Sequence, residues 1–408
     1  MQEQIWDLLI VGGGPAGLAA GVYASRSKLK SLILEKARPG GQAASTEEME
    51  NYPGFGRGAT GSGLTDAMRK HAEEFGCQIV KEEVAEVELE GPVKKLITKQ
   101  GATYQGKAVV FCPGSKPRSL NIKGENEFIG KGVSFCATCD ADFFEELDIV
   151  VVGNGDAAIE EAMYLTKFAE TVTIIVIHDE GILDCNKASA EKAFANSKIK
   201  WVWNSVLDEI KGDGIVEAVA VKNLKTGEIS ELEANGVFFF VGTIPQTSYL
   251  VGKVELNEQG YMVVNEKMET SVPGVYGAGD AIQKYLRQVV TAAADGAIAA
   301  VAAEKYLAEE EAFHSQVLAQ ELPVAVVFWT PQNEESIQLV SAMEQAMSNL
   351  DQAKLVKIDV YRNQLTSSRY EVKQIPSVLV FQQGEVKARF EGSFTAQEVV
   401  NGINADLA

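Results

Sequence analysis

An apolar run near residue 5 ends in glycines: residues 5–26 read IWDLLIVGGGPAGLAAGVYASR. We expect the run up to Val11 to form a buried strand and the alanine-rich part to form a helix. The pattern between them is G-x-G-x-x-G. Gly12 permits a tight turn, Gly14 lets a pyrophosphate approach the backbone, and Gly17 lets the helix pack on the strand. The sequence therefore predicts a dinucleotide-binding fold.

An acidic residue follows the glycines at the spacing that this fold uses. A second apolar strand, Ser31 to Leu34, runs into Glu35. That carboxylate lies roughly 20 residues past the glycines, where it can accept hydrogen bonds from ribose hydroxyls. Amides at the start of the helix would hold the phosphates. Strand, helix and acid together favour a bound dinucleotide over a simple glycine-rich turn.

A second motif of the same kind lies in the middle of the chain. Asp148 to Val152 reads as a strand, and a helix is expected through Phe168. Between them stands Gly153-Asn154-Gly155-Asp156-Ala157-Ala158, the pattern G-x-G-x-x-A. A further strand, Thr171 to Ile177, ends where a nicotinamide dinucleotide would meet the residues that read its ribose. The chain thus carries two dinucleotide motifs.

Two cysteines stand between these motifs, in Cys136-Ala137-Thr138-Cys139, with Asp140 after them. Thiols three residues apart can close a small disulfide if a helix starts there, and the helix start lowers the pKa of one thiol. A zinc site is one alternative, although tetrahedral zinc needs four ligands and no second pair or nearby histidine is present. Two buried cysteines paired by chance are the other. The position between two dinucleotide folds favours a redox-active pair.

A third segment with a binding pattern reads TSVPGVYGAGD, residues 270–280. It combines a turn with a short strand that stops at Gly279-Asp280. The carboxylate of Asp280 can accept a hydrogen bond from a polyol hydroxyl. A helix expected from about Gln288 to Tyr306 would point its N-terminus toward the same place.

Bulk properties narrow the class of protein. The 408 residues exceed one compact core and suggest two or three domains. A formal charge of −20 argues against binding nucleic acid or an anionic membrane through a broad basic face. Five cysteines are an odd and sparse set, and no signal peptide or membrane-spanning stretch is recognisable. We expect a cytoplasmic protein in which a lasting disulfide would be catalytic.

Residues from about 5 to 310 resemble the low-molecular-weight thioredoxin reductase family. The motifs given above carry the resemblance, together with Gly40-Gly41-Gln42, Asn51-Tyr52-Pro53-Gly54, Gly242 with Pro245, and Arg287-Gln288. The resemblance implies an α/β protein with two Rossmann-like domains. FAD would lie on residues 1–117 and 246–310, and residues 118–245 would form a nicotinamide-type domain with the cysteine pair. It also implies a homodimer and a disulfide protein of thioredoxin type as substrate.

The same resemblance assigns roles to single residues. Asp140 looks like the acid that serves Cys136 and Cys139 during exchange. The expected FAD contacts are Gly12, Gly14, Pro15, Ala16, Gly17, Glu35, Lys36, Gly41, Gln42, Asn51, Gly114, Gly279, Asp280, Arg287 and Gln288. The expected contacts of a second dinucleotide are Gly153, Gly155, Asp156 and Ala158. No metal ligand is expected.

The chain departs from the family at the ribose end of the second motif. Members that use NADPH carry His-Arg-Arg there and another arginine beyond, and these bind the 2′-phosphate. Here the stretch reads VIHDEGILD, residues 176–184, and no arginine lies between Arg118 and Arg287. Three donors stay open. They are NADH, with Asp179 or Glu180 on the ribose, a ferredoxin-like or flavin donor, and NADPH held weakly through lysines such as Lys187.

The C-terminal region, about 316–408, resembles a thioredoxin domain. Residues 307–321 are acidic and polar and read as a linker or the end of a helix. After them the region alternates strands and helices, with Phe328-Trp329 where such domains carry a Phe-Trp and Ile375-Pro376 at their usual cis-proline site. Aligning on Phe328-Trp329 puts Asn333 and Ser336 at the two cysteine positions, and the region contains no cysteine. It cannot exchange dithiols, so we expect a docking, dimerising or regulatory module.

Two functions of different classes follow from these observations. The first is an enzyme that passes electrons from a donor through FAD to Cys136–Cys139 and on to a protein disulfide. The second is a flavin-bound redox sensor or partner-binding protein with a defunct nicotinamide site. The intact Cys-x-x-Cys-Asp sequence favours the enzyme. Cys112, beside the first glycine turn, reads as a buried thiol.

Overall fold

A computed structural model describes residues 4–46, 49, 51–56, 58–348 and 350–406. The first motif forms a seven-stranded sheet in the order β3-β2-β1-β6-β5-β4, with β17 paired to β6. Its strands are β1 (Ile5–Val11), β2 (Ser31–Glu35), β3 (Gln78–Lys81), β4 (Val84–Glu88), β5 (Lys94–Thr98), β6 (Thr103–Phe111) and β17 (Val275–Gly277). Since β1, β2, β3, β6 and β17 pair in parallel, their carboxyl ends meet at one edge, where ligands of such sheets bind.

Two helices cross tightly on one face of this sheet. They are α1 (Pro15–Arg26) and α6 (Val289–Phe313). Gly296 makes the close crossing possible, because a Cβ there would lie 1.9 Å from the carbonyl oxygen of Ala16. Small residues of both helices are buried together with β1 side chains such as Leu8 and Ile10. The start of α6 is thereby fixed beside the first glycine turn.

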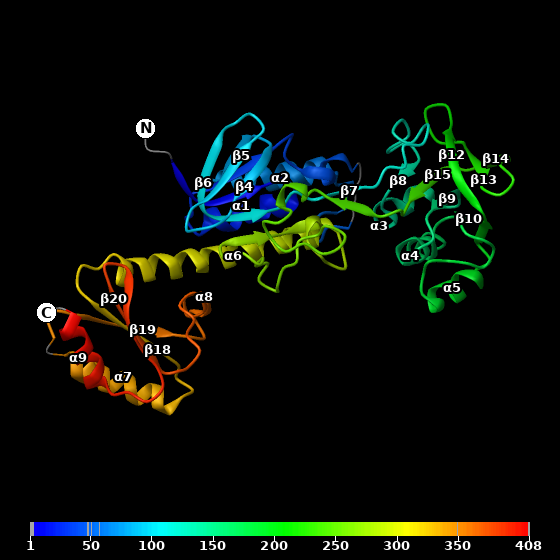
Figure 1. The fold of residues 1–408 in the computed structure, drawn as a ribbon. Coiled ribbons are helices and arrows are strands. Elements are labelled where there is room, and N and C mark those ends of the chain that lie inside the picture. Colours follow the sequence, from blue (N-terminus) through cyan, green and yellow to red (C-terminus); the bar gives the residue numbers. More distant parts are fainter. Residues whose placement is uncertain (1–3, 47–48, 50, 57, 349, 407–408) are drawn as a thin grey trace.

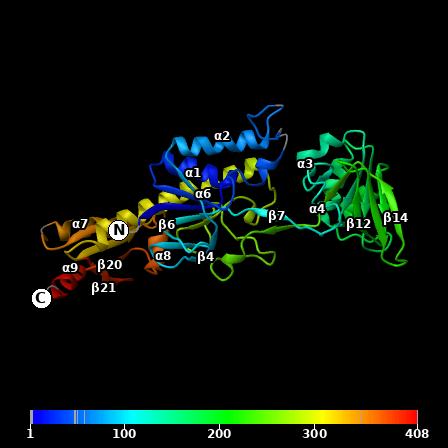
Figure 2. The same cartoon turned by 90° about the horizontal axis from the view of Figure 1, so that it is seen from above.

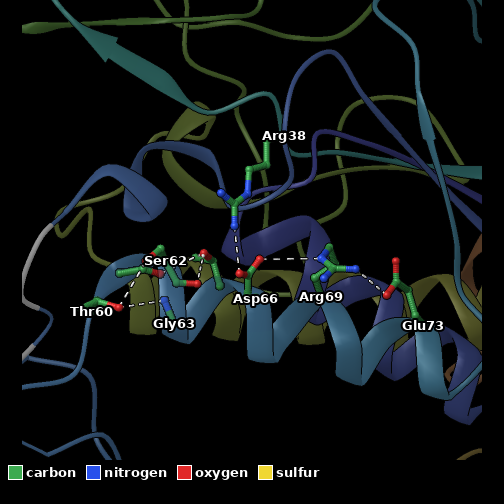
Figure 3. Close-up of polar contacts among 9 residues, drawn as sticks. Arg38, Thr60, Ser62, Gly63, Asp66, Arg69 and Glu73 are labelled. Atoms are coloured by element: carbon green, nitrogen blue, oxygen red, sulfur yellow. Dashed lines mark hydrogen bonds and ion pairs between the residues drawn. The ribbon is translucent and has the colours of Figure 1, made fainter.

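A third helix, α2 (Gly61–Glu74), covers the same side next to α1. Thr60 caps it by accepting a hydrogen bond from Gly63 N at 3.0 Å. Figure 3 shows a row of charges along α2. Asp66 lies 2.9 Å from Arg38 and 3.8 Å from Arg69, and Arg69 lies 2.7 Å from Glu73. Arg38 follows β2, so these pairs tie the segment after Glu35 to the helix.

The second motif forms a separate five-stranded sheet in the order β11-β10-β9-β15-β8, with a three-stranded sheet β12-β13-β14 nearby. Its elements are β8 (Val133–Ser134), α3 (Ala137–Asp140), β9 (Asp148–Val152), α4 (Asp156–Leu165), β10 (Thr171–Ile175), α5 (Lys187–Phe194), β11 (Ile199–Val202), β12 (Ser205–Lys211), β13 (Ala218–Asn223), β14 (Ile229–Glu233) and β15 (Gly236–Phe239). The chain enters and leaves through β7 (Ser115–Pro117) and β16 (Thr243–Pro245), which pair with each other.

The C-terminal region folds around a four-stranded sheet in the order β19-β18-β20-β21. Its elements are β18 (Val324–Trp329), α7 (Glu334–Met347), β19 (Lys354–Asp359), α8 (Gln364–Arg369), β20 (Ser377–Gln382), β21 (Glu385–Phe390) and α9 (Ala396–Asp406). In Figures 1 and 2 this region and the five-stranded sheet lie at opposite ends of the molecule, with the seven-stranded sheet between them.

The acidic stretch 307–321, expected as a linker or the end of a helix, is the end of a helix over most of its length. Helix α6 continues to Phe313, and a π-helical turn follows over His314–Leu318. Burial explains the continuation, because Leu307 joins the core beside α1 while Phe313 joins the core of the C-terminal region. The side chain of Glu309 also accepts hydrogen bonds from Thr366 at the start of α8 (N at 3.1 Å, Oγ1 at 2.6 Å). Helix α6 therefore packs against both the seven-stranded part and the C-terminal region and connects them directly.

Other boundaries differ by a few residues from those expected. The helix expected through Phe168 ends at Leu165, and the strand expected to Ile177 ends at Ile175. Helix α8 was not expected, because its six residues carry no long apolar period. Within the described ranges, no helix combines the length and apolar character that crossing a membrane would take.

Candidate functional site

A cavity of about 1330 Å³ runs from the first glycine turn to the cysteine pair. Its lining comes from both halves of the first three quarters of the chain. Gly12 and Asp280 belong to the part built on the seven-stranded sheet, and Cys136 and Phe143 to the part built on the five-stranded sheet. Sites for small ligands usually measure about 300–1,000 Å³. The cavity is therefore large enough for a dinucleotide cofactor.

The first glycine turn has the geometry that its sequence predicts. A Cβ on Gly12, at φ 101°, would lie 2.2 Å from the carbonyl oxygen of Cys112, and a Cβ on Gly17 would lie 1.9 Å from that of Gly12. Glu35 closes the turn by accepting hydrogen bonds from Gly13 N (2.6 Å) and Ala37 N (2.8 Å). Only glycine lets strand, turn and helix approach this closely.

Most residues expected to contact FAD line this cavity. They are Gly12, Gly14, Pro15, Ala16, Glu35, Lys36, Gly41, Gln42, Asn51, Gly114, Gly279, Asp280 and Gln288. Gly17 and Arg287 lie outside its lining. Gly17 serves the packing of α1 on β1. Arg287 stacks on the Tyr261 ring at 4.2 Å and donates to the carbonyl oxygen of Asp280 at 3.3 Å, so it supports the Asp280 turn from behind.

The cavity contains polar atoms that have no protein partner. Asp280 Oδ1 and the Tyr249 hydroxyl are buried without a hydrogen bond in the described structure, and both residues line the cavity. Burial raises the pKa of Asp280, while Lys284 and Arg287 lower it. Buried polar groups are nearly always satisfied, so these atoms point to a ligand with hydroxyl or amide groups. The site therefore fits FAD.

The cysteine pair forms a disulfide at the far end of the cavity. Cys136 and Cys139 are bonded to each other, and Cys136 is the N-cap of α3. Gln288, at the start of α6, donates from Nε2 to Thr138 Oγ1 at 3.0 Å and lies 3.9 Å from Cys136 Sγ. Asn51 Nδ2 donates to Gln288 Oε1 at 3.1 Å. Asn51 and Gln288, from the part built on the seven-stranded sheet, thus hold the disulfide turn of the part built on the five-stranded sheet against the cavity.

Asp140 lies next to the disulfide and is held by a buried serine. Ser134 Oγ donates to Asp140 Oδ2 at 2.5 Å and accepts from Cys136 N at 3.1 Å. Burial raises the pKa of Asp140, the Ser134 hydrogen bond lowers it, and Asp142 raises it. A carboxyl that keeps its proton above the ordinary pKa can supply that proton to a thiolate.

The second glycine motif lies apart from the cavity. Gly153, Gly155, Asp156 and Ala158 do not line it. Gly153 has φ 133°, and a Cβ there would lie 2.6 Å from the carbonyl oxygen of Phe240. Asp156 Oδ1 accepts from Asn186 N at 2.7 Å and from Asn186 Nδ2 at 2.9 Å. A Cβ on Gly155 would meet nothing within 4 Å, so a ligand can approach the backbone there.

In the C-terminal region, the two positions that correspond to cysteines hold a capped helix start. Asn333 Oδ1 accepts from Ser336 N at 2.9 Å at the beginning of α7. Ser336 is fully buried, and its hydroxyl has no partner among the described residues. The Ile375–Pro376 peptide bond is cis, as expected. The region has the shape of a thioredoxin site without its thiols.

Several cavity residues were missed by the sequence analysis. Ser134 positions Asp140, Tyr249 carries an orphaned hydroxyl, and Gln246 accepts from Lys36 Nζ at 2.6 Å. These residues belong to no motif and are brought in by long-range folding. Gln246 directly follows Pro245, and the Gly242 with Pro245 motif was the signal in the sequence that could have indicated it. Cys112, expected as a buried thiol, is buried and also lines the cavity.

Comparison with known proteins gives two family matches. Residues 6–296 match the pyridine nucleotide-disulphide oxidoreductase family, and residues 304–405 match thioredoxin. A thioredoxin reductase of Peptoclostridium acidaminophilum is 50% identical over 311 residues, covering 75% of this chain and 98% of that protein. A bifunctional thioredoxin reductase/thioredoxin of Mycobacterium leprae is 35% identical over 434 residues, covering 96% of this chain and 94% of that protein.

Two solved structures share the fold of the first three quarters of the chain. Thioredoxin reductase from Streptococcus pyogenes is 40% identical, with a TM-score of 0.70, and covers 74% of this chain and 98% of its own. Thioredoxin reductase from Lactococcus lactis, described as the FR conformation, is 39% identical with a TM-score of 0.54, at 74% and 99% coverage. The two structures have nearly the same identity to this chain and cover nearly the same share of it, but their TM-scores differ.

Proposed function

The chain belongs to the pyridine nucleotide-disulphide oxidoreductases, and within them to the thioredoxin reductases, and from this premise we propose that Cys136 and Cys139 pass electrons from FAD to a protein disulfide. The resemblance inferred from the sequence is thereby confirmed, as is the α/β fold class. The protein is a flavin-dependent disulfide oxidoreductase that acts on thioredoxin-type substrates. The proposal concerns which residues carry out each step.

One observation carries the proposal: the disulfide lies at the wall of the same cavity that the flavin motifs line. When bound, FAD supplies an electron pair to a disulfide. We assign its dinucleotide end to the first glycine turn and Glu35, and a polyol hydroxyl to Asp280. Gln288 and Asn51 hold the disulfide turn at the cavity through Thr138. Electron transfer from FAD to the Cys136–Cys139 disulfide needs the disulfide to lie at this cavity wall.

The thiol chemistry balances through the chain's own groups. The disulfide takes up two electrons and two protons and becomes a dithiol. One thiolate attacks a sulfur of the substrate disulfide, and the substrate's other sulfur leaves as a thiolate. The second cysteine then attacks the mixed disulfide, restores the Cys136–Cys139 bond and releases the reduced substrate. Asp140 supplies a proton to a departing thiolate, which its raised pKa supports.

A protein disulfide has to reach thiols that lie against a cavity wall. Both cysteines are partly buried in the described structure. We infer that the unit carrying them turns away about its connection, formed by β7 and β16. The two TM-scores at nearly equal identity support two arrangements of the same units. A Thr138→Ala change, which removes one of the contacts of Gln288, should favour the turned arrangement.

The finer assignments of domains and assembly are also proposals. We divide the chain into an FAD domain (1–117 and 246–310), a nicotinamide-type domain (118–245) and a thioredoxin-like domain (316–408). Exposed apolar side chains on α1 and α6, namely Tyr23, Ile298 and Val301, support a homodimer. Three free cysteines, Cys77, Cys112 and Cys185, support a reducing compartment, the cytoplasm. A ferredoxin-type donor is one of the three donors that the sequence leaves open.

The test starts from chemically reduced enzyme, so that it does not depend on the donor. Full-length protein is reduced with dithionite under argon and mixed with an oxidised thioredoxin-type protein. We expect the flavin spectrum to return to the oxidised form as substrate thiols appear. Reoxidation of the flavin without substrate thiols would contradict the assigned path.

A further inference from the structure

The two dinucleotide motifs differ at the position that reads the ribose. In the first, Val11 pairs with Leu34, and the next residue, Glu35, accepts from Gly13 N at 2.6 Å. In the second, Val152 pairs with Ile175, so Val176 takes the place of Glu35. Val176 is fully buried and apolar. The second strand pair therefore supplies no carboxylate to its own glycine turn.

A carboxylate reaches that turn from a different segment. Asp184 forms an isolated bridge with Gly155, and its N donates to the carbonyl oxygen of Asn154 at 3.1 Å. Its Oδ2 accepts from Asn154 Nδ2 at 3.2 Å and lies 2.9 Å from His178 Nε2. Asn154 is the middle residue of its glycine turn, as Gly13 is of the first. Asp184 thus brings a carboxylate to the second turn from a loop, and it bonds the Asn154 side chain where Glu35 bonds the backbone of Gly13.

The side chain of Asp184 is exposed, and both of its hydrogen bonds within the described residues go to one carboxylate oxygen, Oδ2. Its exposed fraction is 59%, and the hydrogen bond from His178 lowers its pKa, so it stays a carboxylate. Asp179, one of the two ribose readers expected from the sequence, is paired with Lys225. Asp156 is engaged by Asn186. Of these three carboxylates, Asp184 is the one whose backbone bridges to Gly155 and whose side chain bonds the turn residue Asn154.

The charges around this turn oppose a phosphate on the ribose. Asp156, Asp179 and Asp184 all lie on the segments that border it, and a phosphate monoester brings about −1.5 to −2 charges at neutral pH. A 2′-phosphate is normally held by the planar fork of arginine. The nearest arginines in sequence are Arg118, at the start of the nicotinamide-type domain, and Arg287, beyond its end and bonded to the carbonyl oxygen of Asp280. Lys187, exposed at the start of α5, offers a single point charge.

We infer that the second motif takes a nicotinamide dinucleotide without a 2′-phosphate, of the NADH type, and that Asp184 reads its adenosine ribose. His178 and Asn154 are positioning residues that hold the carboxylate toward the hydroxyls. A carboxylate accepts from both hydroxyls of an unmodified ribose and repels the phosphorylated one. This inference rests on the proposed function, because the donor has to reduce the FAD that feeds Cys136–Cys139.

The experiment follows flavin bleaching in the full-length, FAD-loaded protein under argon. NADH and NADPH are mixed with it separately over a range of concentrations. We expect half-saturation by NADH at a concentration lower by about tenfold or more, the loss that one unpaired charged group causes. Saturation by NADPH at an equal or lower concentration would overturn the inference.

Variants test the role of Asp184. Asp184→Asn keeps the shape and should weaken NADH by about tenfold. Asp184→Arg should move the preference toward NADPH. The matched control is Asp213→Arg, which changes the charge equally on an exposed residue just beyond the far end of β12 and should leave both donors unchanged. If Asp184→Arg left the preference between NADH and NADPH unchanged, Asp184 would not be the residue that reads the ribose.

The failure of this inference is distinguishable from failure of the proposed function. If neither dinucleotide bleaches the flavin but dithionite-reduced protein still reduces a thioredoxin-type disulfide, the donor inference is wrong and the thiol path stands. If NADH bleaches the flavin and no substrate thiol appears, the ribose assignment stands and the thiol path is wrong.

Discussion

Two helix starts in this chain have the same sequence spacing and opposite chemistry. At α3, Cys136 and Cys139 lie three residues apart and form a disulfide. At α7, Asn333 and Ser336 have the same spacing, and Asn333 accepts a hydrogen bond from Ser336 N. The α3 pair borders the flavin cavity. The α7 pair lies in the C-terminal region, at the opposite end of the molecule (Figure 1).

The difference between the two helix starts shows that a thioredoxin-like fold can be kept without its redox chemistry. A thioredoxin fold provides a helix start, a buried second position and a neighbouring cis proline, and the C-terminal region has all three. It contains no cysteine, so it cannot pass electrons by dithiol exchange. Helix α6 joins the C-terminal region to the seven-stranded part through buried contacts and hydrogen bonds. We therefore expect the C-terminal region to serve as a binding surface for partner proteins. The predictions below test this division of roles, beginning with the largest effect.

Replacing either member of the α3 pair should abolish disulfide reduction. Cys136→Ser and Cys139→Ser each leave one thiol, which cannot cycle between disulfide and dithiol. We expect turnover with a thioredoxin-type substrate to fall by about 10³-fold or more, with FAD still bound. Turnover is followed by substrate thiols after dithionite reduction. Cys185→Ser is the matched control, and undiminished turnover in both α3 variants would end the proposed mechanism.

The sequence predicted these regions unequally. The glycine turn, Glu35 and the cysteine pair could be found because each depends on local spacing, and the structure has Glu35 bonded to the turn and the two cysteines bonded to each other. Ser134 and Tyr249 could not be found, since the fold brings them to the cavity from positions without a motif. The sequence left residues 307–313 as a linker or the end of a helix, because the burial of Leu307 and Phe313 depends on packing by two separate parts of the chain.

Asp140 should produce the next largest effect. Burial raises its pKa, so the protonated form persists above the ordinary range of an aspartate. As pH rises through that raised pKa the acid is lost, and the exchange step should slow. Asp140→Asn should lower the rate by about 10²-fold and remove this pH-dependent fall. Rapid mixing of dithionite-reduced protein with substrate across a pH series measures both. The same pH profile in the variant would assign the fall to another group.

Giving sulfur to the second helix start should make the two sites alike. The double change Asn333→Cys and Ser336→Cys places thiols at the same spacing and at the start of a helix. We expect them to oxidise to a disulfide, measured as two protein thiols gained on reduction of the isolated, air-oxidised variant relative to the parent. Flavin reduction should not change. Persistent free thiols in air would show that the C-terminal region lacks more than sulfur.

Removing the C-terminal region should have the smallest effect on the flavin. All flavin motifs lie upstream, so a chain ending at residue 312 should keep its FAD spectrum and its rate of flavin reduction. We expect a changed sedimentation coefficient or Michaelis constant for the protein substrate, since a partner surface is lost. The comparison uses Arg369→Ala as a milder variant that removes the ion pair with Glu310 and keeps the whole region. Identical sedimentation and kinetics in the truncated chain would make the region inert.

Counting electrons tests the central claim most directly. Full-length protein and its Cys136→Ser variant are titrated with dithionite under argon until the flavin is fully bleached. A redox-active disulfide in contact with the flavin takes up one electron pair in addition to that of the flavin. We predict that the parent protein consumes one electron pair more per flavin than the variant. Equal consumption by the two proteins would contradict the account, because the Cys136–Cys139 disulfide would then receive no electrons from the flavin.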